Sequence, residues 1–574
     1  MVKLPLFHKG ESGKILFSGG KSVSTQVFLY LYICLILMLF STLLLRLFNL
    51  TVVKGSYYRR LSEENRIREV LIEPKRGKIL DRKGFIIVEN KEADKDINSS
   101  RLYSPRFYHT EEVTAHLIGY RQKADRNEIK NDPCLYKLKI GDKVGKKGIE
   151  KLFECQLRGK HGKKIIEVDA RSNYLRTLSL IPPQDGETLK LALDLELQKK
   201  AYEAIKDKKA TIVGIKPQSG EVVILTSSPS FSPQAFEDEN QSITSSYLKS
   251  EDKPLFNRST EGTYPPGSIF KLVLAVGALE EKKINERTLF EDTGVLKAGP
   301  LEFGNWYYLQ YGRTDGMVDV VKAIRRSNDI FFYKTGELLT PTKIKVWAET
   351  LGYGKPTGIG FNESEGLIPS EFWKLDLLKD RWYLGDTYNL SIGQGYLLVT
   401  PLQVTNTTAV FANQGYLCKP QLLKIPALPA GRQNSEFKIE NCEKLPISEK
   451  TLGLVREGMK QACSPGGTGW PLFNFKVQSS KFKVEKQKSD ITSEVEEERS
   501  DGKTSEVKVD VACKTGTAES QSKETPPHAW FTVFAPYDNP EIALTVLVEE
   551  GGQGSDVAAP IAKEILKSYF ERSK

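Results

Sequence analysis

One apolar run constrains the fold of this chain more than any other feature of its sequence. No charged residue interrupts the stretch from Val27 to Leu45, and a helix of that length crosses the roughly 30 Å hydrocarbon core of a bilayer. Four lysines precede the run, which favours a cytoplasmic N-terminus, although basic residues also follow it. No small-residue cleavage site comes after it. We therefore predict a cytoplasmic tail at 1–22 and an uncleaved signal-anchor helix at 23–48, and not a signal peptide or a buried core helix.

Length and composition set the broad class of the rest. The chain has 574 residues, more than one domain usually contains, so at least two folded units are expected. Hydrophobic residues make up 39% and charged residues 27%, as in ordinary globular proteins. The net charge of +10 suits a neighbouring anionic surface such as phospholipid or wall polymer. No basic block is dense enough to predict a nucleic-acid partner.

Six cysteines lie beyond the apolar run, and an anchored chain would place them outside the cytoplasm, where disulfides form. Their scattered spacing contains no C-x-x-C pair and no metal-binding pattern. We interpret them as separate buried or solitary thiols. They are Cys134, Cys155, Cys418, Cys442, Cys463 and Cys513.

The chain after the anchor divides in two by composition. Residues 49–207 are charged and turn-rich and predict an elongated pedestal without a catalytic cluster, in which Leu195 to Lys206 has helical apolar spacing. From Ala210, two β-branched segments flank a Pro-Gln-Ser-Gly turn, which is typical of a β-hairpin. We place the main boundary before this hairpin and predict a second domain at 208–574.

The C-terminal end of the second domain has a similar pattern. Residues 528–550 predict another hairpin, and Val557 to Phe570 predict an amphipathic terminal helix. Strands at both ends with helices between them predict an α+β fold, in which helices pack on an antiparallel sheet. One stretch inside the domain, 477–510, is rich in Lys, Glu, Ser and Asp, and we expect a disordered surface insertion there.

A serine and a lysine three residues apart begin an apolar helical stretch, in the segment Tyr264-Pro-Pro-Gly-Ser268-Ile-Phe-Lys271. On a helix this spacing places the lysine ammonium beside the serine hydroxyl. A lysine desolvated in a pocket loses its charge more readily and can then accept the proton of the serine nucleophile. Alone the pattern is weak, because it arises by chance in most chains of this length.

Two further elements arrive in the order that such chemistry needs. Ser327-Asn328-Asp329 lies just ahead of an aromatic helical run, and Lys514-Thr515-Gly516-Thr517 follows a short strand. The three elements resemble the active-site signature of the penicillin-recognising serine enzymes, in which they converge on one cleft. We expect Ser268, Lys271, Ser327, Asp329 and Lys514 to be catalytic.

The third element is suited to binding substrate. Gly516 leaves room for a substrate backbone to approach the strand edge, while Lys514 and Thr515 supply a cation and a hydroxyl for a terminal carboxylate. Free backbone groups of the strand can pair with an extended peptide. We therefore expect Thr515, Gly516 and Thr517 to bind substrate.

Beyond these elements, nearly the whole chain resembles a class B penicillin-binding protein of the elongation type. The resemblance implies a β-lactamase-like transpeptidase domain on a non-catalytic pedestal, anchored in the cytoplasmic membrane with the catalytic domain outside. Matching segments include Asn65-Arg66, 74–84, 148–150 and 157–159 in the pedestal, and Asn257-Arg258, 392–395 and 400–403 in the catalytic domain.

The resemblance also implies an activity. Ser268 would attack the penultimate D-alanine of a peptidoglycan stem peptide, Lys271 would act as base and Ser327 would relay the proton, with the backbone N–H groups of Ser268 and Thr517 as oxyanion hole. An amine of a second stem peptide, or water in a D,D-carboxypeptidase side reaction, would resolve the acyl-enzyme. β-Lactams are the implied inhibitors, a SEDS glycosyltransferase in the same membrane is the implied partner, and no cofactor is implied.

Two details concern the subtype. Asp329 stands where many relatives have asparagine, and aspartate is frequent in the elongation type. Some of those members bind zinc through Asp, His and Cys residues upstream of this motif, but residues 289–318 contain neither His nor Cys, so we predict no metal.

Three alternatives remain open. A division-type transpeptidase differs little in these motifs. A β-lactamase would need a water-activating E-x-x-L-N element, which is missing between Ser327 and Lys514. A β-lactam sensor or an idle scaffold is disfavoured by the intact catalytic signature and the single span.

Overall fold

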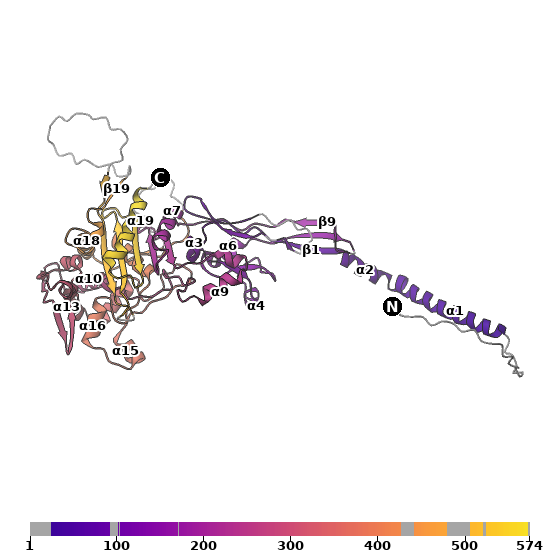
Figure 1. Ribbon diagram of the computed structural model, residues 1–574, viewed down its shortest axis with the longest axis horizontal. Helices are drawn as coiled ribbons and strands as arrows, with labels where there is room; N and C mark the ends of the chain where they lie inside the picture. Colours follow the sequence, from indigo (N-terminus) through magenta and orange to yellow (C-terminus); the bar gives the residue numbers. More distant parts are fainter. Residues whose placement is uncertain are drawn as a thin grey trace, which may run out of the picture. The chain divides into compact units, whose positions relative to one another are not determined.

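The computed structural model describes residues 25–91, 101–102, 104–169, 171–425, 441–478, 506–520 and 524–571. The chain separates into two compact units (Figure 1). One comprises residues 1–71, 96–101 and 163–182, and the other comprises 72–95, 102–162 and 183–574.

The first unit contains the apolar helix. Helix α1 covers Thr25–Phe48. By length and composition, Val27–Val53 is a candidate membrane span, and its most apolar part is not buried against other residues of the protein. A short π-helical turn at Asn49–Val53 leads to α2 (Gly55–Arg66). A four-stranded sheet follows, in the order β4-β1-β8-β9. Its strands are β4 (Arg101–Leu102), β1 (Ile67–Ile72), β8 (Gly162–Val168) and β9 (Tyr174–Ile181).

The second unit begins with the small sheet β10-β2-β3-β5 and several short elements. The strands are β2 (Ile79–Leu80), β3 (Ile86–Asn90), β5 (Arg106–Tyr108), β10 (Leu189–Lys190), and the pair β6 (Arg121–Lys123) and β7 (Lys143–Gly145). The helices are α3 (Glu111–Ile118), α4 (Arg126–Lys130), α5 (Gly148–Leu152) and α6 (Glu154–Arg158).

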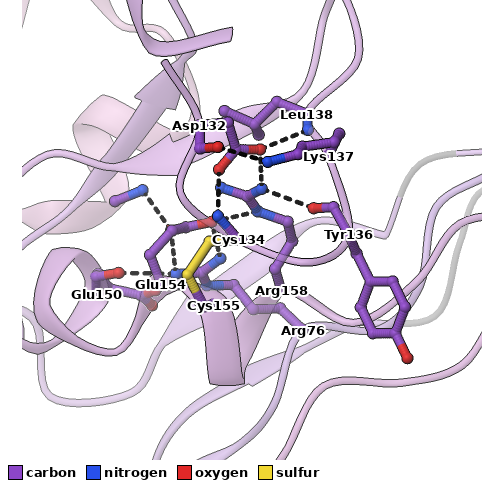
Figure 2. Close-up of a disulfide and its surroundings, with 11 residues drawn as sticks. Arg76, Asp132, Cys134, Tyr136, Lys137, Leu138, Glu150, Glu154, Cys155 and Arg158 are labelled. Atoms are coloured by element: carbon purple, nitrogen blue, oxygen red, sulfur yellow. Dashed lines mark hydrogen bonds and ion pairs between the residues drawn. A yellow bond between two sulfur atoms is a disulfide. The ribbon is translucent and has the colours of Figure 1, made fainter. Parts of the chain in front are cut away.

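A buried ion-pair network holds these short elements together (Figure 2). Arg76 contacts Glu150 at 2.6 Å and Glu154 at 2.7 Å, and Arg106 contacts the other oxygen of Glu150 at 2.9 Å. Arg158 joins Glu154 at 2.8 Å. Segments 74–84, 148–150 and 157–159, which resemble the penicillin-binding proteins, thus meet in one core because their charges need one another when they are buried.

The six cysteines that follow the apolar run form three disulfides, so their interpretation as separate thiols was wrong. The pairs are Cys134–Cys155, Cys418–Cys442 and Cys463–Cys513. Cys418 and Cys442 lie opposite each other on strands β17 (Tyr416–Cys418) and β18 (Cys442–Lys444). The partners are 21 to 50 residues apart, and only the tertiary fold brings them together.

The catalytic domain is built on a five-stranded antiparallel sheet in the order β12-β11-β23-β22-β21. Its strands are β11 (Ala210–Ile215), β12 (Val222–Ser228), β21 (Ala512–Ala518), β22 (His528–Ala535) and β23 (Ile542–Val548). The two predicted hairpins, β11–β12 and β22–β23, are confirmed.

Helices cover both faces of this sheet. On β22, Phe531 and Val533 pack in one core with α7 (Leu195–Ile205) and α19 (Ala559–Glu571), while Trp530 and Phe534 pack in the other with α10 (Lys271–Glu280) and α17 (Pro401–Ala412). The alternation follows the two-residue period of a strand. Figure 1 shows α19 alongside the C-terminal strands. The predicted α+β fold is confirmed.

The domain contains further helices and short strand pairs, of which α8 (Pro233–Glu237) and α9 (Gln241–Lys249) pack in a separate cluster with Ala115 and Phe231. The other helices are α11 (Trp306–Tyr311), α12 (Val320–Arg326), α13 (Asp329–Leu339), α14 (Pro341–Thr350), α15 (Glu371–Leu378), α16 (Leu384–Ser391) and α18 (Glu449–Ala462). Short strand pairs are β13 (Phe290–Glu291) with β16 (Met317–Val318), and β14 (Val295–Ala298) with β15 (Leu301–Gly304).

Two expectations need adjustment. Helix α7, which we assigned to the end of the pedestal, packs on the catalytic sheet because Leu197, Ala201 and Ile205 need a hydrophobic partner. The insertion expected at 477–510 is described only at its two ends. There β19 (Lys476–Gln478) pairs with β20 (Glu506–Lys508), and residues 479–505 lie outside the described residues.

Candidate active site

Ser268 lies in a 3₁₀ turn, Gly267–Phe270, that leads directly into α10. Side chains three residues apart eclipse in such a turn, so Ser268 and Lys271 share one side. Gly267 has φ +54°, and a Cβ on it would lie 2.7 Å from the Thr517 carbonyl oxygen. Glycine is therefore required here, both for the left-handed backbone and for the close approach of β21.

Lys271 is fully buried, and its contacts differ from the expected ones. Its Nζ donates to Asp329 Oδ1 at 2.6 Å, to the Ser327 carbonyl at 2.8 Å and to Ser327 Oγ at 3.3 Å. Within the part of the chain that the structure describes, no hydrogen bond joins it to the Ser268 hydroxyl. Burial lowers the pKa of Lys271, and the negative charge of Asp329 partly opposes that shift.

Ser327 occupies a strained turn between two helices. It ends α12 in the left-handed conformation, with φ 53° and ψ 39°, and Asn328 then caps α13 by accepting the Phe331 N–H. A non-glycine residue in this region costs of order 1–3 kcal/mol, a strain that is common at functional sites. The turn aims Ser327 Oγ between Lys271 and Lys514.

Lys514 lies on β21, the edge strand of the catalytic sheet. Its Nζ is fully buried and donates to Ser327 Oγ at 2.8 Å and to the Thr515 carbonyl at 3.0 Å. Burial, and then the neighbouring charge of Lys271, hold the pKa of Lys514 well below its usual range. These contacts place Lys514 Nζ beside the Ser327 hydroxyl, and its expected role in binding a terminal carboxylate stays a prediction.

The other residues of this strand turn in different directions. Thr515 is largely buried and its hydroxyl donates to Thr468 Oγ1 at 2.8 Å, whereas Thr517 is exposed. A Cβ on Gly516 would lie 2.9 Å from the Pro266 carbonyl and 3.1 Å from Ile269 Cγ1. Gly516 therefore makes room for the turn that carries Ser268, and its expected role in the approach of substrate to the strand edge stays a prediction.

Sequence reasoning missed several neighbours of this cleft. Thr468 gave no signal because it lies in a turn-rich segment with no recognisable motif. Trp306 donates its backbone N–H to Asp329 Oδ2 at 2.8 Å, and Asn305 accepts the Asp329 N–H at 3.1 Å. Gln394 donates to the Thr517 carbonyl at 3.2 Å, and the segment 392–395 that carries it was already singled out by resemblance.

The family model described as penicillin binding protein transpeptidase domain matches residues 210–567, and the penicillin-binding protein dimerisation domain matches 96–191. The chain belongs to the penicillin-binding protein transpeptidase family. The peptidoglycan D,D-transpeptidase MrdA of Salmonella typhimurium is 30% identical to this penicillin-binding protein, over 93% of this chain and 94% of its own.

Solved structures of relatives agree. The crystal structure of Pseudomonas aeruginosa PBP2 in complex with WCK 5153 is 29% identical, with a TM-score of 0.67, over 88% of this chain and 96% of its own. A peptidoglycan synthase complex that coordinates polymerization and crosslinking contains a chain 25% identical, with a TM-score of 0.69, over 96% and 99% of the two chains. This penicillin-binding protein is a membrane-anchored, elongation-type peptidoglycan D,D-transpeptidase that uses a serine.

A zinc ion, as some relatives hold upstream of the Ser327 motif, does not fit the residues of this penicillin-binding protein. Asp292 and Asp315 lie upstream, but their carboxylate oxygens already accept hydrogen bonds from protein N–H groups. No His or Cys accompanies them in 289–318. Among all the residues the structure describes, no group of three or more His, Cys, Asp or Glu is placed to hold a metal.

Proposed function

We propose that Ser268 is the nucleophile of this transpeptidase, with Lys271, Ser327, Asp329 and Lys514 as its catalytic partners. The observation that carries the proposal is the Ser327 hydroxyl, which lies 3.3 Å from one buried lysine nitrogen and 2.8 Å from another. Two lysines that share one hydroxyl in a desolvated cleft cannot both keep their protons easily, because like charges and burial each disfavour the ammonium form.

The reaction begins with the neutral amine of Lys271. It takes the proton of Ser268 Oγ, which attacks the carbonyl carbon of the penultimate D-alanine of a stem peptide. Asp329, 2.6 Å from Lys271 Nζ, stabilises the ammonium that forms. The C–N bond then breaks, and the proton that Lys271 took passes through the Ser327 hydroxyl, which Lys514 also contacts, to the nitrogen of the departing D-alanine. An amine of a second stem peptide then attacks the ester, and its proton returns by the same groups to Ser268 Oγ, which is released.

The oxyanion of the tetrahedral intermediate needs backbone donors. We assign the N–H groups of Ser268 and Thr517 to this role, because a Cβ on Gly267 would lie only 3.3 Å from the Thr517 nitrogen. Loss of one such donor usually slows catalysis by about 10²–10³. The rigid packing of the 3₁₀ turn against β21 would keep both donors in place before substrate arrives.

Substrate binding falls to the edge of the catalytic sheet. Among the described strands, none pairs with β21 on its outer side, so an extended stem peptide can add to it by backbone hydrogen bonds. The exposed Thr517 offers a hydroxyl for the terminal carboxylate. Because Lys514 is fully buried and the Thr515 hydroxyl donates to Thr468, we assign the carboxylate first to Thr517, with Thr515 as a further substrate-binding residue.

The proposed function also implies an inhibitor class, a partner enzyme and an orientation in the membrane. A β-lactam carries a strained amide that would acylate Ser268 in place of the stem peptide. We further propose that α1 crosses the cytoplasmic membrane with the catalytic domain outside. The glycan strand would be made by a SEDS glycosyltransferase in the same membrane, an assignment supported by the relative in a peptidoglycan synthase complex.

Mass spectrometry of the full-length protein in detergent micelles tests the proposal. A labelled penicillin should add one covalent mass on the peptide containing Ser268, and Ser268→Ala should abolish the label. Ser259→Ala, which changes a buried serine outside the cleft, is the matched control and should retain it. Label on another residue would refute the assignment, and sustained hydrolysis of nitrocefin instead of a single burst would favour a β-lactamase.

A further inference from the structure

Residues 292–315, here called the upstream loop, are connected to the turn at Ser327 by the buried carboxylate of Asp292. Asp292 Oδ2 accepts hydrogen bonds from the Asn305 amide and the Asn328 amide, at 2.8 Å and 2.9 Å. It also accepts the backbone N–H of Asp315 at 2.8 Å. Asn328 donates in addition to Asp315 Oδ2 at 3.1 Å. Two stretches of the loop and the turn therefore converge on two carboxylates.

Arg326 completes this arrangement from the last residue of α12. Its Nε donates to Asp315 Oδ1 at 2.9 Å, and its guanidinium carbon lies 4.6 Å from the centre of the Tyr307 ring. Its Nη1 donates to the Gly466 carbonyl at 3.1 Å. Gly466 is two residues before Thr468, the partner of Thr515. One side chain thus contacts the upstream loop, α11 and the segment beside β21.

We propose that Arg326 is a positioning residue of the transpeptidase. Its guanidinium and the hydrogen bonds among Asp292, Asp315 and Asn328 hold the Ser327 turn, where some relatives use a metal ion. A metal would need free carboxylate oxygens, and here both carboxylates are engaged by N–H donors. A fixed arginine supplies the positive charge that the two carboxylates require.

The contacts of Arg326 and the upstream loop bear on two groups of the site, Ser327 and Asp329. Arg326 directly precedes Ser327, whose left-handed backbone must be held by its surroundings. Asn305, which donates to Asp292, also accepts the Asp329 N–H, and the neighbouring Trp306 N–H binds Asp329 Oδ2. Displacing the loop would therefore move both the Ser327 hydroxyl and the carboxylate that pairs with Lys271.

Substitution of Arg326 tests the inference, which rests on the proposed roles of Ser327 and Asp329. Arg326→Met should lower the penicillin acylation rate constant at saturation by about tenfold or more, with little change in the constant for non-covalent binding. Arg326→Lys should recover part of the rate, because it restores the charge without the planar fork. Arg325→Met is the matched control, since Arg325 binds the Pro465 carbonyl of the same segment but not Asp315. It should acylate at nearly the parent rate.

A parent-like rate in Arg326→Met, or an equal loss in Arg325→Met, would overturn the positioning role. If penicillin still labels Ser268 in that case, the proposed function survives, whereas a parent protein unlabelled at Ser268 would remove both. Metal content is measured separately, by elemental analysis of the full-length protein before and after o-phenanthroline. Less zinc than protein and an unchanged acylation rate are expected. Stoichiometric zinc, with a rate lost on chelation and restored by Zn²⁺, would also overturn the inference.

Discussion

At the scale of single residues, the cleft is governed by two buried lysines that meet at one serine hydroxyl. Lys271 has a carboxylate partner in Asp329, whereas Lys514, among the residues that the structure describes, donates to the neutral oxygens of Ser327 and Thr515. Burial lowers the pKa of both, and only for Lys271 does a carboxylate in direct contact oppose the shift. The two lysines are therefore not equivalent. Lys271 holds a proton more readily than Lys514, which suits the role of base that we propose for Lys271.

Removal of the Asp329 charge should shift the pH dependence of acylation. In Asp329→Asn the amide oxygen still accepts from Lys271, but the charge that raises the pKa of Lys271 is gone. The acid limb of the pH profile of acylation should therefore move to lower pH, because Lys271 becomes neutral at lower pH. Stopped-flow acylation with a chromogenic β-lactam measures it. Glu519→Gln removes an exposed carboxylate that is not in contact with Lys271 and should leave the limb in place. An unmoved limb in Asp329→Asn would argue against Lys271 as the base.

Lys514 and Thr517 should separate proton relay from carboxylate binding. Lys514→Ala should reduce kcat/KM by roughly 10- to 150-fold, the usual worth of a charge-assisted hydrogen bond, for both a free-acid D-Ala-D-Ala peptide and its C-terminal amide. Thr517→Val should reduce it mainly for the free acid, because only that substrate offers a carboxylate. Steady-state release of D-alanine or D-alaninamide measures both. A loss in Lys514→Ala confined to the free acid would restore its carboxylate role.

At the scale of elements, strand β21, which carries Lys514, is held by its neighbour β22 and by contacts with the segment after α18. All of β21 pairs with β22. The Cys463–Cys513 disulfide links the residue before Lys514 to the end of α18. Thr468, which follows that end, contacts Thr515. An edge strand that must accept a substrate strand keeps its outer side open, so its position has to be set by contacts elsewhere.

Loss of this disulfide should affect both stability and catalysis. The double variant Cys463→Ala/Cys513→Ala should lose about 2–4 kcal/mol of unfolding free energy, and its acylation should slow because β21 is less well held. Cys418→Ala/Cys442→Ala is the control: it removes the disulfide between β17 and β18. That variant should be destabilised yet acylate normally. Thermal melts and acylation rates are the measurements. Equal acylation in both double variants would mean that the Cys463–Cys513 bond serves stability alone.

At the scale of the whole molecule, the larger unit contains two kinds of core. The catalytic sheet is covered on both faces by apolar side chains. The smaller elements between residues 72 and 162 depend in addition on buried ion pairs around Glu150, which is fully buried between Arg76 and Arg106. Burial alone would raise the pKa of Glu150, but the two arginines outweigh it and bring the pKa to about 2. Its ionised form is therefore an integral part of this core.

Breaking this network should destabilise the unit in a pH-dependent way. Glu150→Gln leaves two arginines partly unpaired and should cost about 3–5 kcal/mol near neutral pH. Because the pKa of Glu150 is depressed in the folded state, its contribution is present above the ordinary value of 4.5 and is lost as the pH falls through about 2. As the pH is lowered between these values, the free energy of unfolding measured with denaturant should therefore fall less steeply for Glu150→Gln than for the parent. Glu203→Gln, in an exposed pair with Lys206, should behave like the parent. Parallel curves for Glu150→Gln and the parent would contradict the prediction.

Local patterns in the sequence determined the candidate membrane helix, the two hairpins and the fold class of this protein. The apolar run, the two hairpins and the α+β fold follow from hydrophobic periodicity and turn residues, which act over a few neighbouring positions. The three motifs in their order predict that Ser268, Ser327 and Lys514 belong to one site. Each of these signals is contained in a short stretch of chain.

Only the tertiary structure decided which distant groups meet. It paired six cysteines, turned Lys514 toward Ser327, and filled the space beside Gly516 with the turn of Ser268. It also brought Arg326 to Asp315 and to the segment beside β21. The physical reason is that hydrogen bonds, ion pairs and disulfides act between atoms a few ångströms apart. A single sequence records which residues can form them, but the packing of the whole chain selects the partners.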